Sequence, residues 1–259
     1  MKKTTFNPGK KIMASASMLL VSTMMLSSAT YAWFSMNKDV TVTGMAVDVK
    51  SDATFLLVKQ GTATVDAIRS AKKTRDTAVT SSAVLYPTAH DTVTAASTGI
   101  TAIEAADASD SNAKDIWYYK YSNDPETSNV DVTAATYVPT ADFANYVLVN
   151  EFSLTVAEGS NELSNLHVKS CKITPATGGD QAVKVLVAGA NGCEEFDGTG
   201  GNGTNINLQT ANVTGTGVST VKVYVYWDGN DSDVYTNGIA DLKNTEVEVE
   251  LTGDIVPAT

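Results

Sequence analysis

Short runs in which apolar and polar residues alternate recur from about position 40 to the end of the chain. Successive side chains of a β-strand point to opposite faces, so a period of two predicts strands that are buried on one face. No segment of ten or more residues beyond position 37 has a convincing helical period, and the best helix candidate is 64–75. The runs that predict strands cover 40–49, 55–58, 145–156, 165–173, 182–187, 220–227 and 246–251.

Gly, Asn, Asp and Thr separate these runs, which favours an all-β fold with antiparallel sheets and one solvated face. We expect one β-sandwich domain over 33–259, with insertions near 60–135 and 189–218. The run 182–187 follows 165–173 after a turn rich in Pro and Gly, as the second arm of a hairpin would.

The first 37 residues have the features of a secretory signal peptide. Four lysines make the first eleven residues basic, and no charged residue lies between positions 12 and 37. Small side chains precede position 33, so we expect a signal helix over 1–32 and cleavage between Ala32 and Trp33. The alternative is an uncleaved anchor, because 26 uncharged residues are enough to cross a bilayer. Only such an uncleaved leader would bring the protein to a membrane.

The composition limits the partners. The formal net charge is −11, from 18 Lys and Arg against 29 Asp and Glu. A phosphate backbone attracts a basic face, so we do not expect nucleic acid as the main partner. Hydrophobic residues make up 43% of the chain and charged residues 18%, which is typical of a folded core and not of a disordered chain.

The segment 29–47, with the sequence ATYAWFSMNKDVTVTGMAV, resembles the start of bacterial proteins exported with a SipW-type signal peptide, the TasA and camelysin family. Looser similarities lie at 85–87, 146–149 and 223–229. The resemblance implies a jelly-roll-like β-sandwich and a Gram-positive-type bacterium that secretes the protein to its surface or biofilm matrix. TasA itself assembles into matrix fibres, in which the mature N-terminal strand of one subunit completes the sheet of the next. The resemblance therefore implies that this chain forms fibres in the same way. Long Ala/Thr/Gly insertions and two cysteines depart from the family's pattern.

The residues themselves give strand donation a physical basis. A strand at the mature N-terminus, here 40–50, is tethered on one side only and can pair with the open sheet edge of a neighbour. Val40, Val42, Val47 and Val49 would then be buried in the acceptor. Head-to-tail pairing does not close, so it produces a filament. The alternative is that this strand belongs to the monomer's own sandwich.

Two aromatic residues, Trp33 and Phe34, lie beside the expected new N-terminus. Aromatic side chains dominate the energetics of many interfaces, so these two are candidates for a docking anchor. They are equally compatible with a flank that the export machinery recognises, or with a plug over the monomer's core.

Cys171 and Cys193 are the only cysteines. In an exported chain a pair of cysteines suggests a disulfide, which here would close a hairpin over 175–192 and contribute about 3 kcal/mol in the chain-entropy model. The alternative is two buried thiols without a bond.

A group of hard oxygen ligands follows the run 220–227. Calcium favours such loops, although the spacing here is not that of an EF-hand. The alternative is a solvated turn, and no other cofactor is expected. The candidate ligands are Asp228, Asn230, Asp231 and Asp233.

Catalytic motifs are not apparent in the sequence, although some camelysin relatives are described as proteases. His90 and His167 are the only histidines, and no zinc-protease, nucleophile-elbow or dinucleotide-binding motif is present. We therefore expect a structural protein and not an enzyme, with copies of itself as the partner and other matrix or cell-wall components as further contacts. The alternative function is a monomeric or wall-associated extracellular binding module.

Overall fold

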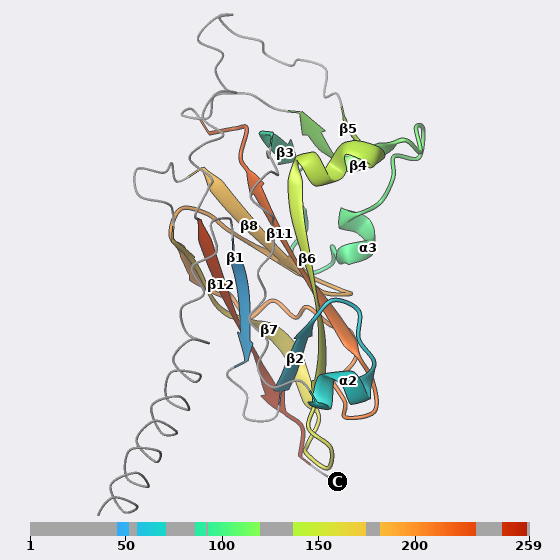
Figure 1. Cartoon of the computed structure of the whole chain (residues 1–259), viewed down its shortest axis with the longest axis vertical. Helices are drawn as coiled ribbons and strands as arrows, with labels where there is room; N and C mark the ends of the chain where they lie inside the picture. Colours follow the sequence, from blue (N-terminus) through green and yellow to red (C-terminus); the bar gives the residue numbers. More distant parts are fainter. Residues whose placement is uncertain are drawn as a thin grey trace, which may run out of the picture. The chain divides into compact units, whose positions relative to one another are not determined.

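The computed structural model describes residues 46–51, 56–70, 86–91, 93–119, 137–174, 182–231 and 245–257. These residues form mainly antiparallel β-strands arranged in two larger sheets and a smaller third sheet (Figure 1). The predicted all-β class is thereby confirmed.

The first large sheet, sheet A, contains four strands. β12 runs antiparallel to β7 with two register shifts, whereas β1 runs parallel to β12. The order across the sheet is β1 (Ala46–Ser51), β12 (Glu246–Ile255), β7 (Leu163–Thr174) and β10 (Gly200–Asn202).

The second large sheet, sheet B, contains five strands that all pair antiparallel. β11 lies at its centre and is paired along both sides. The order is β2 (Leu56–Gln60), β6 (Val147–Val156), β11 (Ser219–Trp227), β8 (Val183–Ala188) and β9 (Cys193–Phe196).

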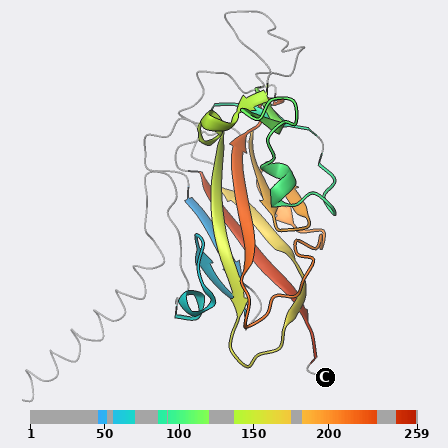
Figure 2. The same ribbon diagram turned by 90° about the vertical axis from the view of Figure 1, so that its right-hand side faces the viewer.

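The main hydrophobic core lies between sheets A and B, which lie one behind the other in Figure 2. Alternate residues of each strand enter this core, as the period of two predicts. They include Val221, Val223, Val225 and Trp227 of β11, Val183, Val185 and Val187 of β8, and Val168, Ile173, Val247, Val249 and Leu251 of sheet A.

The other face of sheet B is also buried, which the sequence pattern did not predict. Tyr224 and Tyr226 of β11 have exposed fractions of 0% and 1% because a second hydrophobic cluster covers them. The covering elements, which we call the cap, are β3 (Thr88–His90), α3 (Ile100–Ile103), β4 (Ala113–Tyr119), β5 (Tyr137–Pro139) and the 3-10 helix η1 (Thr140–Asn145).

The cap is formed largely by residues within the expected insertion near 60–135. Although the stretch 93–112 is rich in Ala, Thr, Ser and Asp, it carries Ile103 into the second cluster, where it meets Trp117 of β4. The same insertion contains α2 (Val65–Ser70), at the position of the best helix candidate.

The insertion near 189–218 contains β9 and β10 and is closely packed. At Gly203 a Cβ atom would lie 1.8 Å from the carbonyl oxygen of Val168, so only glycine allows the two backbones to approach this closely. At Gly189 a Cβ would lie 2.1 Å from the carbonyl oxygen of Leu208.

The expected hairpin between 165–173 and 182–187 is wrong. β7 pairs with β12 and β10 in sheet A, whereas β8 pairs with β11 and β9 in sheet B. The connection therefore crosses from one sheet to the other. Alternation identifies a strand and its buried face, but it does not identify the sheet to which the strand belongs.

Candidate functional site

The N-terminal edge of sheet A is the first candidate site. β1 pairs with β12 from Ala46 opposite Glu246 to Ser51 opposite Leu251. Among the strands that the structure describes, β1 has no neighbour on its other side. An edge strand presents a row of backbone N–H and C=O groups that can pair with another chain.

The register aligns the valines of β1 with the core face of β12. Val47 lies opposite Val247 and Val49 lies opposite Val249. Val247 and Val249 are buried between the two sheets. Paired residues of adjacent strands share a face, so positions 47 and 49 lie on the face of sheet A that is turned to the core.

On the opposite face the register brings charges together. Asp48 pairs with Glu248, and Lys50 pairs with Glu250. Glu250 also accepts a hydrogen bond from the Ser170 hydroxyl at 3.2 Å. In strand pairing generally, like charges at directly opposed positions are destabilising.

The remaining residues predicted for export and strand donation lie outside the part of the chain that the structure describes. They are Ala32, Trp33, Phe34, Val40 and Val42.

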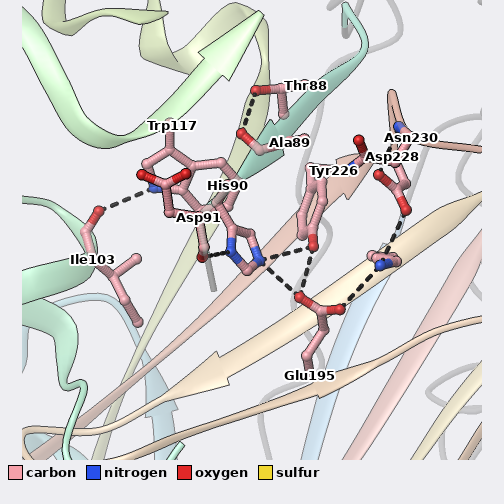
Figure 3. A network of polar contacts seen from close by, with 11 residues as sticks. Thr88, Ala89, His90, Asp91, Ile103, Trp117, Glu195, Tyr226, Asp228 and Asn230 are labelled. Carbon is pink, nitrogen blue, oxygen red and sulfur yellow. Dashed lines mark hydrogen bonds and ion pairs between the residues drawn. The ribbon is translucent and has the colours of Figure 1, made fainter. Parts of the chain in front are cut away.

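The second candidate site is a network of charged and polar side chains between the cap and sheet B, shown in Figure 3. His90 comes from the end of β3, where it pairs with Trp117 of β4, and the ring centroids of these two residues lie 4.9 Å apart. The other members come from the outer face of sheet B and its end. We call the set of His90, Lys184, Glu195, Tyr226 and Asp228 the His90 cluster.

His90 has hydrogen-bond partners at both ring nitrogens. Nδ1 lies 2.7 Å from the carbonyl oxygen of Asp91, and Nε2 lies 2.7 Å from Oε2 of Glu195. The Tyr226 hydroxyl lies 3.0 Å from Nε2 and donates to the same Glu195 oxygen at 2.8 Å. The His90 side chain is 7% exposed, whereas the Glu195 side chain is 29% exposed, so water reaches the contact from the Glu195 side.

The contacts shift the pKa values of both partners. Burial alone would lower the pKa of His90, but the hydrogen bond and the negative charge of Glu195, together with the Asp91 carbonyl, raise it above 6.5. Burial alone would raise the pKa of Glu195, but His90, Lys184 and Tyr226 lower it to about 2. His90 and Glu195 therefore form an ion pair below pH 6.5, down to the lowered pKa of Glu195.

Lys184 extends the cluster to the end of β11. Its ammonium group lies 3.1 Å from Oε1 of Glu195 and 3.0 Å from Oδ2 of Asp228. Beside these residues is a cavity of about 320 Å³, which Val93 and Cys193 also line. The cavity is large enough for a small ligand, and both charged and apolar side chains line it.

A second ionic contact joins α3 to sheet B. The Lys222 ammonium lies 2.8 and 2.9 Å from the two carboxylate oxygens of Glu104, and the Tyr224 hydroxyl donates to Glu104 at 2.9 Å. Burial and the neighbouring carboxylate raise the pKa of Tyr224, so its hydroxyl keeps its proton as a donor. Trp117 of β4 donates its Nε1–H to the Ile103 carbonyl at 3.0 Å.

The structure corrects the disulfide expected between Cys171 and Cys193, since both thiols are free and buried. Cys171 lies in the core between sheets A and B, whereas Cys193 lies in the cluster beneath the cap. Sheet B separates these two clusters. Burial raises the pKa of Cys171 to about 12 and that of Cys193 to about 11, so both remain thiols at neutral pH.

The loop proposed for calcium is described as far as Asp231, and Asp233 lies outside the described residues. One oxygen of Asp228 accepts the Asn230 backbone N–H at 2.9 Å, and the other pairs with Lys184. The described residues contain no group of three or more His, Cys, Asp and Glu side chains placed to hold a metal ion. Calcium binding at this loop stays a prediction.

The sequence singled out His90 but not its partners. Glu195 lies 105 residues further along the chain, and Lys184 and Tyr226 are polar or aromatic positions within runs that read as ordinary strands. The one available signal was that Tyr224 and Tyr226 place two large amphipathic side chains on the face of β11 that was expected to be solvated. The second histidine, His167, is in β7, and its Nδ1 lies 2.6 Å from the Asn165 carbonyl oxygen.

None of the helices in the described part of the chain combines the length and the apolar composition needed to cross a membrane. The chain matches no protein-family model, and no curated protein and no solved structure matches it either.

Proposed function

We propose that this chain is a secreted structural protein of the cell surface or biofilm matrix of a Gram-positive-type bacterium, and that it assembles into fibres by donating its N-terminal strand. In this proposal the sandwich is jelly-roll-like, and β1 of one subunit pairs with β12 of the next. The observation that carries the proposal is the position of β1, which is the first described strand of the chain and lies at a sheet edge with β12 as its partner.

Exchange of β1 between subunits would keep the same interactions. The six residue pairs between β1 and β12 involve no other strand, so they can form within one chain or between two. Swapping an identical element in this way is a low-cost route to association. Because the donor and the acceptor are different surfaces, each subunit would still have one of each to offer, and a fibre would grow.

The acceptor edge, β12, would offer apolar side chains as well as backbone hydrogen-bonding groups. With β1 removed, Val247 and Val249 would lose the neighbouring positions 47 and 49. Burying one valine side chain stabilises a protein by about 1.5–3 kcal/mol, so the vacant edge would favour an incoming strand of the same sequence. Signal cleavage after Ala32 would produce the free N-terminus that strand donation needs.

We propose no catalytic role for the His90 cluster or the cysteines. Both ring nitrogens of His90 already have partners, and its side chain is 7% exposed. The two thiols have raised pKa values and lie in hydrophobic clusters, so neither is an activated nucleophile.

The test compares three chains under the electron microscope. Protein that begins at Trp33 is expected to form filaments that survive high salt. A version with Val47→Asp and Val49→Asp is expected to remain monomeric, because two carboxylates would face the core of the acceptor. The matched control, Asp48→Ser with Lys50→Ser, changes the other face of the same strand and is expected to form filaments.

A second candidate is a monomeric or wall-associated binding module, which the cavity beside the His90 cluster favours. A module of this kind would stay monomeric in all three versions and would retain a small ligand. Filaments that form equally well with Val47→Asp and Val49→Asp would contradict strand donation through β1 while leaving other routes of assembly to be examined.

A further inference from the structure

The hydrogen bonds of His90 require a proton on each ring nitrogen. Nδ1 faces a backbone carbonyl and Nε2 faces a carboxylate, and both of these groups only accept hydrogen bonds. A neutral imidazole has one N–H, so it can satisfy only one of them. The geometry therefore fits the imidazolium form (Figure 3).

The proton could instead lie on Glu195, but its surroundings favour the carboxylate. Oε2 accepts a hydrogen bond from the Tyr226 hydroxyl, and Oε1 lies 3.1 Å from the Lys184 ammonium. In either arrangement the pair of His90 and Glu195 shares one proton. Removing it would neutralise the imidazole and leave one ring nitrogen with its lone pair facing an acceptor 2.7 Å away: Nε2 against the Glu195 carboxylate, or Nδ1 against the Asp91 carbonyl.

The groups around the pair cannot compensate for that loss. Lys184 is already divided between two carboxylates, and Tyr226 has one hydroxyl proton, which it donates to Glu195. With His90 charged, two positive and two negative side chains balance within the His90 cluster; without it, one negative charge is in excess. The titratable and charged groups around His90 and its partners are these: Glu195 and Cys193 of β9, Asp197 after it, Lys184 of β8, Tyr226 of β11, Asp228 after it, Tyr118 of β4, and Asp91.

We propose that His90 is a pH-dependent contact that closes the cap over the cavity when the imidazole is protonated and loosens it when the proton leaves. His90 is the last residue of β3, so the side-chain contact with Glu195 ties this edge of the cap to sheet B. Other ties nearby include backbone hydrogen bonds from Gly229 N–H to the Thr88 carbonyl at 2.8 Å and from Cys193 N–H to the Ala95 carbonyl at 2.8 Å, and a side-chain hydrogen bond between Tyr118 and Asn230. The inference does not depend on fibre assembly.

The shifted pKa values give the direction of the effect. The pKa of His90 is raised above 6.5, so its contribution is complete below 6.5 and is lost as the pH rises through the raised value. Opening is therefore expected as the pH rises above 6.5 through the raised pKa of His90, while the core between sheets A and B stays intact.

The test uses the full chain labelled with ¹⁵N, because its two histidines can be followed separately by long-range proton–nitrogen spectra. At pH 5 both ring nitrogens of His90 are expected to be protonated, and one of them is expected to lose its proton as the pH rises. Above the midpoint, amide exchange at Asp91, Cys193 and Gly229 is expected to become severalfold faster after correction for base catalysis, because the weakened contact lets this edge of the cap open more often.

Three variants make the test specific. His90→Gln is expected to remove the pH dependence of the corrected exchange rates, whereas the matched control His167→Gln is expected to keep it. Glu195→Gln is expected to move the His90 midpoint to lower pH, because it removes the negative charge that holds the proton.

Two results would overturn the proposal. One is a His90 ring that keeps a single neutral tautomer from pH 5 to pH 8, which is measured in the unaltered chain and does not depend on a variant folding. The other is a His90 that titrates while the corrected exchange rates at all three amides stay the same.

Discussion

β1 and the cap are both attached to the large sheets, but by different means. β1 is attached by one parallel ladder with β12, and its register includes a like-charge pair. The cap is attached by buried aromatic and aliphatic side chains and by two ionic contacts. An attachment made mainly by backbone pairing can be replaced by the same strand from another copy, whereas a set of interlocking buried side chains cannot. The comparison suggests that the N-terminal edge is the part of the fold suited to exchange.

The largest expected effect tests how firmly the cap is attached. Trp117→Ala would remove a side chain with an exposed fraction of 0% that contacts Phe143 and Tyr226 edge-to-face. Such truncations cost about 3–5 kcal/mol, so chemical denaturation should show a large loss of stability. The control Val218→Ala, at a position that is 40% exposed, should change stability by less than about 0.5 kcal/mol. Equal effects would mean that the cap contributes little.

A smaller effect is expected from the ionic contact beneath α3. Glu104→Gln removes the charge that pairs with Lys222, and we expect a loss of about 1.5–3 kcal/mol because hydrogen bonds to charged groups are of this size. Glu158→Gln is the matched control. Glu158 is 82% exposed and pairs with Arg69 at 3.4 Å, so its replacement should be nearly neutral in the same thermal unfolding measurement.

Acid should weaken the cap through Glu195. Its pKa is lowered to about 2 from an ordinary value of 4.5, so its contribution is present above 4.5 and is lost as the pH falls from 4.5 through 2. The unfolding temperature of the unaltered chain should therefore fall more steeply between pH 5 and pH 2.5 than that of Glu195→Gln. Parallel curves for the two proteins would show that the ion pair does not stabilise the fold in this range.

The smallest expected effect concerns the edge strand. Asp48→Lys would replace a like-charge pair with an opposite-charge pair across from Glu248, and such pairs contribute about 0.2–1 kcal/mol. Amide exchange within β1 should slow, while exchange within β11 should not change. If amide exchange in β1 stays the same or becomes faster, position 48 does not lie opposite Glu248, and the register between β1 and β12 is contradicted.

The sequence pattern predicted strands well where one face enters the core. The alternation in β11 and β12 correctly placed Val221, Val223, Val247 and Val249 on buried faces. It did not predict the burial of Tyr224, because the residues that cover this tyrosine come from a segment rich in Ala, Thr and Ser. Periodicity indicates which residues share a face of a strand. It does not indicate which other segments of the chain pack against that face.

The candidate sites also differ in whether they depend on one segment of the sequence or on contacts between distant segments. That an N-terminal strand could lie at an edge was predictable, because its position in the chain is visible in the sequence. The ion pair between His90 and Glu195 was not, since it depends on how β3 and β9 approach each other in space. The disulfide prediction failed for a similar reason: spacing suggested a hairpin, but the two cysteines lie on opposite sides of sheet B.

The most direct test of strand donation is a cross-link that can form only between chains. One preparation carries Asp48→Cys and another carries Glu248→Cys, two positions that pair in the register of β1 with β12. Fibres grown from the mixture and oxidised should yield covalent dimers on a reducing-agent-free gel. Neither variant alone should form covalent dimers, and neither should the unaltered chain with its two buried thiols.

A second mixture, of Asp48→Cys with Thr252→Cys, is the control for register. Its two positions are about 13 Å out of register and should remain uncross-linked, since a disulfide needs Cα atoms within about 7 Å. Fibres that form from the first mixture without covalent dimers would contradict the pairing of β1 with a neighbour's β12.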